Sequence, residues 1–219
     1  VVSPFVPQKE VADAEGMAHA IGVDLIRIDT DILKNRDVVK NSSQRCYYCK
    51  KAIFSLIRDA AGKEGIEFLA HAVNLDDIDD YRPGLRAAEE LGFLAPLAEA
   101  GLTKSDIRRL SKEMGLDTWD KPSQSCLATR IPYDTPIIKD DLLKIDQAET
   151  LLQELGFDQV RVRCHGSLAR IEVSPEKVLK LFEEPARQTI SAAFENIGFS
   201  YTSVDIDGYK TGKMNNEVL

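Results

Sequence analysis

The sequence predicts an α/β protein: a mostly parallel sheet with helices on its faces, followed by a small α+β domain. Up to residue 70, short apolar segments alternate with segments of helical periodicity, as in parallel strands joined by helices. Residues 119–136 contain or border several prolines and lack periodicity, which is typical of a boundary or a functional connector. After Pro136 the pattern changes to one helix and two alternating segments. We therefore expect domains at 1–133 and 134–219.

The first domain is built from short elements. Apolar residues at helical spacing predict a helix over 8–21, which Gly22 ends. An alternating segment predicts a strand at 24–28. A helix over 46–61 and a buried strand at 68–70 follow, and then helices at 84–92 and 103–115. Thr103 is a good N-cap for the last of these, with Asp106 at its third helical position.

The second domain has an α-β-β-α-β order. A helix carrying Ile145 and Leu152 leads through Gly156 into a strand at 160–164. A turn at 165–167 and a second alternating segment at 169–173 predict a hairpin. A helical stretch over 176–197, interrupted at Pro185, and a strand at 201–206 complete the domain.

Composition excludes several classes of protein. The net charge of −8 argues against a broad nucleic-acid surface. No apolar run approaches the roughly 20 residues of a membrane helix, and we expect no signal peptide. Four cysteines in a chain of 219 residues favour thiol, metal or redox use over a disulfide framework. We expect a cytoplasmic protein.

Cys46 and Cys49 are the most specific local feature. Cysteines three apart at the start of a helix lie on one face, about one turn apart, and Arg45 and the helix N-terminus favour their thiolates. They could also simply pack in the interior. A closed zinc site needs further ligands with a recognisable spacing, and the remaining cysteines and histidines are scattered. Three thiolates also suit an iron–sulfur cluster with one open iron, and Cys126 in the loop 121–130 is the natural third ligand.

The remaining polar candidates each allow two interpretations. Arg161 and Arg163 project to the same face of their strand, where they could clamp a phosphate or carboxylate or simply be solvated. Glu149 and the acidic run 76–80 could bind metal or be solvated, and for the run we favour solvation. Cys164, inside a strand, is expected to be a buried structural thiol.

Several segments in order resemble the LarE-type sulfur transferases of the PP-loop pyrophosphatase superfamily. They span nearly the whole chain, and their combination is more specific than any one of them. The matching segments are RCYYCKK (45–51), DYRPG (80–84), PLAEAG (96–101), TKSDIR (103–108), WDKP (119–122), CLATRIPY (126–133), RVR (161–163) and DGYKTGKMN (207–215). The resemblance implies that the first domain is a Rossmann-like, adenine nucleotide alpha-hydrolase-like PP-loop domain.

The resemblance also implies an activity. Such enzymes adenylylate a carboxylate with ATP and Mg²⁺ and then deliver sulfur to it. The substrate would be a pyridinium dicarboxylate mononucleotide, converted to a thiocarboxylate for the nickel-pincer cofactor. Some members give up sulfur from one cysteine in the loop matching that of Cys126. Others, with three cysteines as here, resemble carriers of a 4Fe-4S cluster, which would assign Cys46, Cys49 and the catalytic Cys126 as ligands.

Substrate-binding residues follow from the same resemblance. Arg161 and Arg163 match a strand associated with substrate phosphate, Glu149 matches a glutamate near the substrate and metal site, and Arg130 of the cysteine loop is assigned to the substrate as well. The superfamily's Ser-Gly-Gly-x-Asp-Ser loop is not found in this chain. In the family it precedes the segment that here begins at Val1, so we expect an N-terminally incomplete PP-loop domain with an incomplete ATP site.

Alternatives and partners complete the expectations. Two other functions fit parts of the pattern: a PP-loop enzyme that thiolates tRNA, and a non-enzymatic zinc- or cluster-binding protein. The acidic composition makes nucleic acid the poorer partner. We expect a homo-oligomer that takes a small mononucleotide and an external sulfide donor and that has no membrane segment.

Overall fold

The computed structural model describes residues 1–78 and 83–210, and these form two compact units. The first unit contains Val1, Ile28–Thr30 and Gln44–Ser123. The second contains Val2–Arg27, Asp31–Ser43 and everything described from Gln124 onward. The second unit thus takes up most of the N-terminal segment. The division into domains at 1–133 and 134–219 stays a prediction.

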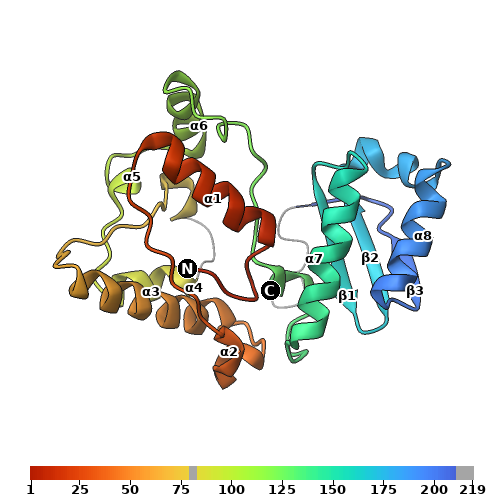
Figure 1. The fold of residues 1–219 in the computed structure, drawn as a ribbon, viewed down its shortest axis with the longest axis horizontal. Coiled ribbons are helices and arrows are strands. Elements are labelled where there is room, and N and C mark those ends of the chain that lie inside the picture. Colours follow the sequence, from red (N-terminus) through yellow and green to blue (C-terminus); the bar gives the residue numbers. More distant parts are fainter. Residues whose placement is uncertain (79–82, 211–219) are drawn as a thin grey trace. The chain divides into compact units, whose positions relative to one another are not determined.

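The first unit is organised around two packed helices, α3 (Arg45–Lys63) and α4 (Pro83–Glu90) (Figure 1). Their core contains Phe54, Ala88 and Phe93, and the rings of Phe54 and Phe93 have centroids 4.5 Å apart. The shorter elements η2 (Leu75–Asp77), α5 (Pro96–Glu99) and α6 (Lys104–Glu113) complete the unit. The predicted helices at 46–61, 84–92 and 103–115 are confirmed, with shifted ends.

The capping signals of the first unit are confirmed in detail. Thr103 accepts a hydrogen bond from the Asp106 N–H at 3.1 Å, and the Asp106 carboxylate accepts one from the Thr103 N–H at 3.1 Å. This reciprocal arrangement is a capping box. Asp76 adds a third contact by accepting from the Lys104 N–H at 2.9 Å. Local side-chain chemistry therefore determines where α6 begins.

The strands predicted at 24–28 and 68–70 do not form as predicted. Residues 24–28 form no strand, and Leu25 and Ile26 are half exposed. Near 68–70 only one parallel bridge forms, between Ala70 and Leu94. The extended sheet expected for this part is absent from the described residues, because short apolar segments become strands only when other strands satisfy their backbone groups. The mixed α/β class itself is confirmed.

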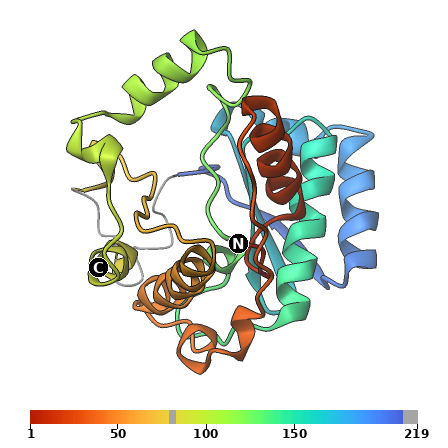
Figure 2. The same cartoon turned by 60° about the vertical axis from the view of Figure 1, so that its left-hand side comes forward.

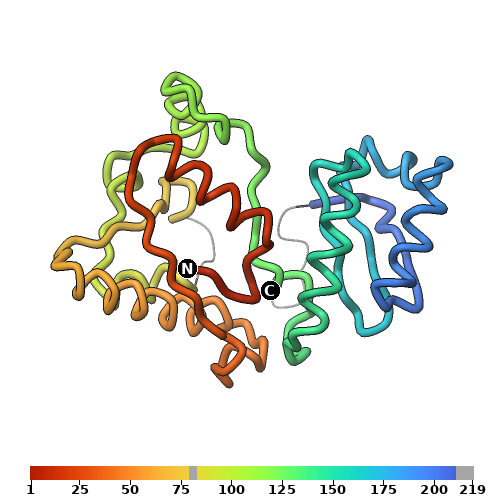
Figure 3. The backbone as a smooth tube through the Cα atoms, viewed as in Figure 1, coloured from red at the N-terminus to blue at the C-terminus, as the bar shows by residue number. Residues whose placement is uncertain are grey.

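The second unit carries the sheet. Strands β1 (Val160–His165) and β2 (Leu168–Val173) form the predicted hairpin, and β3 (Tyr201–Val204) pairs with β2 in parallel. Helices α7 (Lys139–Glu154) and α8 (Ala186–Ile197) lie side by side on one face of the sheet (Figure 2). The 3-10 helix η4 (Pro175–Phe182) follows β2 in the chain and ends before α8 begins, so the predicted interruption at Pro185 is confirmed. Figure 3 shows the chain passing from α7 through a tight turn into β1.

The two faces of this sheet differ in chemistry. The face toward α7 and α8 is apolar and is packed into the core of the unit. Its buried residues are Leu142, Ile145, Ala148 and Leu152 of α7, Val160, Val162 and Cys164 of β1, Ala169, Ile171 and Val173 of β2, and Ile190 and Phe194 of α8. The opposite face carries charged residues, because successive side chains alternate along a strand.

The N-terminal part of the second unit holds the loop that precedes α7. It contains α1 (Gln8–Ile21), as predicted, with η1 (Ile32–Lys34) and α2 (Arg36–Val39). Asn41 is fully buried and donates side-chain hydrogen bonds to the carbonyls of Pro132 at 2.7 Å and Thr135 at 3.0 Å. The Ile137 N–H donates to the Val39 carbonyl at 2.9 Å. Segments far apart in sequence are therefore tied together around residues 131–137.

Within residues 1–78 and 83–210, no helix is both long enough and apolar enough to cross a membrane.

Candidate functional site

Cys126 lies at the start of a short, firmly anchored 3-10 helix, η3 (Leu127–Arg130). The next two residues, Leu127 and Ala128, are buried, and so is Ile131. The Leu127 N–H donates to the Phe5 carbonyl at 2.9 Å. Cys126 itself is only half buried. Its backbone is thus held in the interior while its thiol retains some exposure.

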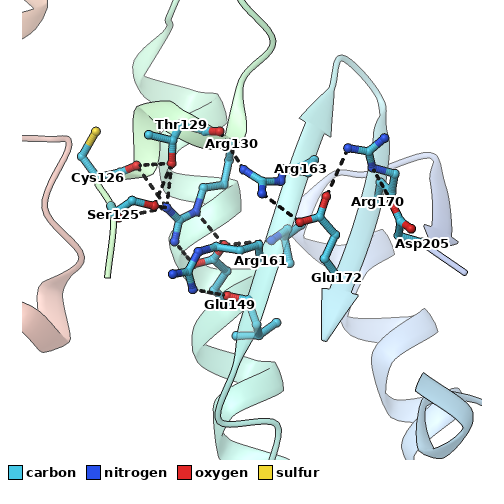
Figure 4. A network of polar contacts seen from close by, with 12 residues as sticks. Ser125, Cys126, Thr129, Arg130, Glu149, Arg161, Arg163, Arg170, Glu172 and Asp205 are labelled. Atoms are coloured by element: carbon cyan, nitrogen blue, oxygen red, sulfur yellow. Dashed lines mark hydrogen bonds and ion pairs between the residues drawn. The ribbon is translucent and has the colours of Figure 1, made fainter. Parts of the chain in front are cut away.

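Arg130 connects this loop to the rest of the second unit (Figure 4). Its side chain is fully buried. Nε and Nη2 donate to the two oxygens of Glu149, both at 2.9 Å, in the bidentate geometry that suits a guanidinium and a carboxylate. Nη1 faces the loop, where it is 2.9 Å from the Ser125 carbonyl and 3.1 Å from the Cys126 carbonyl. One guanidinium therefore joins α7 to the backbone of the cysteine loop.

Glu149 is engaged by protein groups on both sides. Besides Arg130, it accepts a hydrogen bond from the Val162 N–H of β1 at 2.8 Å. The residue is only 5% exposed. Solvation of Glu149, one of the two interpretations that the sequence allowed, is therefore wrong. Its assignment to substrate binding, like that of Arg130, stays a prediction.

The charged face of the sheet carries Arg161 and Arg163, as the strand period predicts. Arg161 is opposite Glu172 in the hairpin, and Arg163 is opposite Arg170. Arg161 is 2% exposed and Arg163 is 5% exposed, so a solvated strand face is excluded. Guanidinium groups that are so nearly buried require hydrogen-bond acceptors or opposite charges, since an uncompensated charge in the interior is costly.

Arg163 is the link between this face and the cysteine loop. Its Nη2 donates to Glu172 at 2.8 Å and its Nη1 to the Thr129 carbonyl at 2.8 Å. Its Nε is buried without a hydrogen-bond acceptor among the described residues. An incoming anion would satisfy that remaining donor.

Arg161 is in a crowded positive environment. Burial, followed by the charge of Arg130, lowers its pKa. Its Nη1 donates to the Val160 carbonyl at 2.6 Å, and its guanidinium lies 5.2 Å from the centre of the Tyr209 ring. The positive charge of the neighbouring Arg130 favours an anionic ligand near Arg161 over a cationic one.

The network extends to residues that the sequence analysis did not select. Arg170 donates to Glu172 at 3.2 Å and forms an ion pair with Asp205 at 3.7 Å. The charged side chains labelled in Figure 4 are Arg130, Arg161, Arg163 and Arg170 with Glu149, Glu172 and Asp205, and Asp146 interacts electrostatically with Arg130 and Glu149 beside them. Glu172 could have been found from the sequence, because it faces Arg161 in the predicted hairpin. Asp205 could not, because it depends on the pairing of β3.

A small hollow beside Glu149 is lined by the start of α1 and by α7. Its lining includes Lys9 and Glu10 of α1, Asp146, Glu149 and Gln153 of α7, and Gln124. Burial raises the pKa of Asp146, although a hydrogen bond from the Gln8 backbone opposes the shift. Pro7, the N-cap of α1, makes no side-chain capping bond, so Asp146 supplies an acceptor at this helix N-terminus.

Cys46 and Cys49 occupy the first turn of α3 in the first unit. Both are half buried, and none of the four cysteines, all of them described, is in a disulfide. Their spacing puts both on one face of the helix, as predicted. A Cβ at Gly84 would lie 2.9 Å from the Lys50 Cγ and 3.5 Å from the Cys46 carbonyl. The absence of a side chain at Gly84 therefore lets α4 approach this turn closely.

The cysteine pair and Cys126 belong to different units. Within the described ranges, no group of three or more His, Cys, Asp or Glu side chains is placed to hold a metal ion. A three-cysteine site stays a prediction, supported by the chemistry of its donors, since thiolates are the usual ligands of iron–sulfur clusters.

Cys164 differs from the other three cysteines. It is 1% exposed, and burial raises the pKa of its thiol to about 11. Its Sγ lies 3.5 Å from the Gly166 carbonyl. The prediction that it is buried is confirmed, and a thiol that stays protonated at neutral pH is a poor ligand and nucleophile.

The acidic run 76–80 is partly described. Asp76 accepts from the Lys104 backbone, as above, and Asp77 forms a capping box with Asn74. Asp79 and Asp80 lie outside the described residues, as do Tyr81 and Arg82 of the motif 80–84 and residues 211–215 of the motif 207–215. Asp76 and Asp77 therefore serve as helix caps.

The fold and the site together define a mixed α/β protein whose half-buried cysteine is anchored to a buried arginine–carboxylate network. No family model matches the chain. It is 32% identical to the pyridinium-3,5-bisthiocarboxylic acid mononucleotide synthase of Lactiplantibacillus plantarum, over 97% of this chain and 76% of that protein. An uncharacterized protein of Synechocystis is 38% identical over 98% of this chain and 80% of its own length. One of Methanocaldococcus jannaschii is 30% identical over 84% of this chain and 71% of its own length.

These similarities cover nearly the whole chain. The protein therefore belongs to the LarE-type family, the family of the Lactiplantibacillus plantarum synthase.

Proposed function

We propose that this protein is an ATP-dependent sulfur transferase that converts a carboxylate of a pyridinium dicarboxylate mononucleotide into a thiocarboxylate, for nickel-pincer cofactor biosynthesis. Family membership over 97% of the chain supports the reaction class. The observation that carries the proposal is the buried arginine–carboxylate network, tied directly to the loop of Cys126. It joins buried arginines to the loop of a half-buried cysteine within the second unit.

The substrate is recognised through its phosphate. The Nε donor of Arg163 has no acceptor among the described residues, so a ligand can bind to it. Arg161 lies on the same face of the sheet. A phosphate monoester carries up to two negative charges and several acceptor oxygens, so it suits two arginines and the unsatisfied Nε donor of Arg163. Guanidinium groups suit this task because they present several donors in one plane.

The chemistry then proceeds in two balanced steps. The substrate carboxylate attacks the α-phosphorus of ATP, an oxygen–phosphorus bond forms, and pyrophosphate leaves. A hydrosulfide ion next attacks the resulting acyl carbon, a carbon–sulfur bond forms, and AMP leaves with the oxygen. A carboxylate is a poor electrophile, so the first step is what makes the second one feasible.

The thiolates of Cys46, Cys49 and Cys126 are proposed to hold a 4Fe-4S cluster. Cys46 and Cys49 fit such a role because they are half buried and one helical turn apart, and Cys126 because its thiol is half buried on an anchored backbone. When bound, the cluster would supply an open iron that accepts a sulfide. Cys164 takes no part, since its thiol is buried and its pKa is raised.

The test is a product assay with the purified protein. The mononucleotide, ATP, Mg²⁺ and sulfide are incubated with the protein, and the small molecules are analysed by mass spectrometry. We expect the replacement of a carboxylate oxygen by sulfur, with AMP and pyrophosphate formed in equal amounts. Sulfur incorporation into tRNA in place of the mononucleotide, or stoichiometric zinc and no transfer, would refute the proposal.

A further inference from the structure

We propose that Arg130 and Glu149 are positioning residues: they fix the backbone at Cys126 and make no contact with substrate. This inference rests on the proposed function, in which Cys126 takes part in sulfur transfer. It changes the role that the resemblance implies for both residues, from substrate binding to support of the cysteine loop.

The donors of Arg130 are already committed to protein groups. Nε and Nη2 hold the two oxygens of Glu149, and Nη1 has the Ser125 and Cys126 carbonyls and two hydroxyl oxygens within 3.1 Å. The side chain has no exposed surface. A substrate could reach it only by displacing one of these partners, which costs more than the new contact returns.

Glu149 is equally committed. Its Oε1 accepts from both Arg130 Nε and the Val162 N–H, and its Oε2 accepts from Arg130 Nη2. These bonds place the carboxylate between α7, β1 and the cysteine loop. Glu149 therefore links β1 to Arg130, and Arg130 in turn binds the cysteine loop.

Hydrogen bonds hold the backbone of the loop at Cys126 and at the residues that follow it. The Cys126 carbonyl accepts from Arg130 Nη1 at 3.1 Å and from the Thr129 hydroxyl at 2.8 Å. The Thr129 carbonyl accepts from Arg163, and the Leu127 N–H donates to Phe5. A half-buried thiol on such a backbone has a defined direction, which is what a metal ligand or a sulfur carrier requires.

The planar guanidinium, with hydrogen-bond donors on two edges, is essential to this arrangement. Arg130 binds a carboxylate with one edge and backbone carbonyls with the other. A lysine ammonium at the same place keeps the charge but reaches only one of the two groups. Arg130→Lys therefore separates the positioning role from the charge.

The experiment measures the alkylation rate of each cysteine in the full-length protein. The protein is treated with a chelator, so that no metal shields the thiols, and with iodoacetamide, and the modified peptides are quantified by mass. In Arg130→Lys and in the nearly isosteric Glu149→Gln, we expect Cys126 to react about tenfold faster than in the wild type. This corresponds to the loss of roughly one charge-assisted hydrogen bond to the loop.

Two internal controls accompany this measurement. Cys164 should stay slow in every variant, because it is buried in the core of the same unit. Arg170→Lys alters a partly exposed arginine of the same network, which binds Glu172 and Asp205, and it should leave the Cys126 rate within about twofold of the wild type. Rates at Cys46 and Cys49 should not change.

The outcomes separate the inference from the proposed function. An unchanged Cys126 rate in both variants, with Cys164 still protected, overturns the positioning role. Fast alkylation of Cys164 in either variant also overturns it, since the pair would then support the whole unit and not the loop. The measurement needs no substrate, so absence of thiocarboxylate in the wild type would refute the proposed function alone.

Discussion

Removal of the Glu172 carboxylate should strongly destabilise the second unit. Glu172 is fully buried on β2 and accepts from Arg163 at 2.8 Å and from Arg170 at 3.2 Å. In Glu172→Ala both guanidinium groups lose this partner. Arg170 retains Asp205 and has a side chain 29% exposed, so it can turn toward solvent. The side chain of Arg163 is only 6% exposed, so it cannot turn toward solvent.

The magnitude follows from this difference. Breaking a buried ion pair by removing one partner costs about 3–5 kcal/mol, because a charge is left uncompensated in the interior. Since only Arg163 is fully trapped, we expect the lower end, about 3 kcal/mol. With a urea dependence of roughly 2 kcal/mol per molar, the unfolding midpoint should fall by about 1.5 M. Glu172→Gln, which keeps the volume and one acceptor oxygen, should lose about half as much.

The assay is urea unfolding followed by far-ultraviolet circular dichroism. Asp158→Asn is the matched control, because it breaks an ion pair with Lys177 in which the Asp158 side chain is 77% exposed. Its loss should be far smaller, since solvent replaces the lost partner. A Glu172→Ala midpoint shift no larger than that of the control would show that the arginines are not held in a low-dielectric interior, and the argument for an anion site would fail.

Three further predictions test other parts of the molecule. Arg161→Ala should weaken binding of the mononucleotide by about tenfold or more, measured by titration calorimetry, and unchanged affinity would remove its role with phosphate. Serine at any of the three predicted cluster ligands should abolish cluster assembly, measured as iron and sulfide content, whereas Cys164→Ser should not. The raised pKa of Asp146 means that the folded protein binds this proton more tightly than the unfolded chain, so stability is lost as the pH rises through that pKa. Asp146→Asn should thus raise the free energy of unfolding at neutral pH but not at about pH 3, and an equal change at both would contradict this.

Local signals made much of the helical structure predictable. The helix at 8–21, the capping box of α6 and the interruption at Pro185 all depend on residues a few positions apart. The hairpin of β1 and β2 was predictable for the same reason. The alternation within β1 also predicts that Arg161 and Arg163 lie on one face of the sheet.

Contacts distant in sequence could not be predicted in this way. Residues 24–28 alternate like a strand, yet a strand also needs a neighbour, which the segment itself does not specify. Likewise the resemblance assigns Arg130 to the substrate, and that assignment stays a prediction. The bidentate bond of Arg130 to Glu149 depends on how α7 packs against η3, which spacing does not encode.

The charge on the sheet face shows the same limit. Two arginines in alternation fit both a solvated face and an anion clamp. Burial decides against the solvated face, and burial depends on η3, which covers this part of β1. The exposure of a strand face is thus a tertiary property.

The most direct test of the account is to analyse product and protein together after sulfur transfer. The protein is incubated with mononucleotide, ATP, Mg²⁺ and increasing concentrations of sulfide. The masses of both the nucleotide product and the intact chain are then measured by mass spectrometry. The account predicts thiocarboxylate in excess of one per chain, rising with sulfide, and a Cys126 that keeps its sulfur. Absence of thiocarboxylate, or a yield limited to one per chain with loss of sulfur from Cys126, would contradict it.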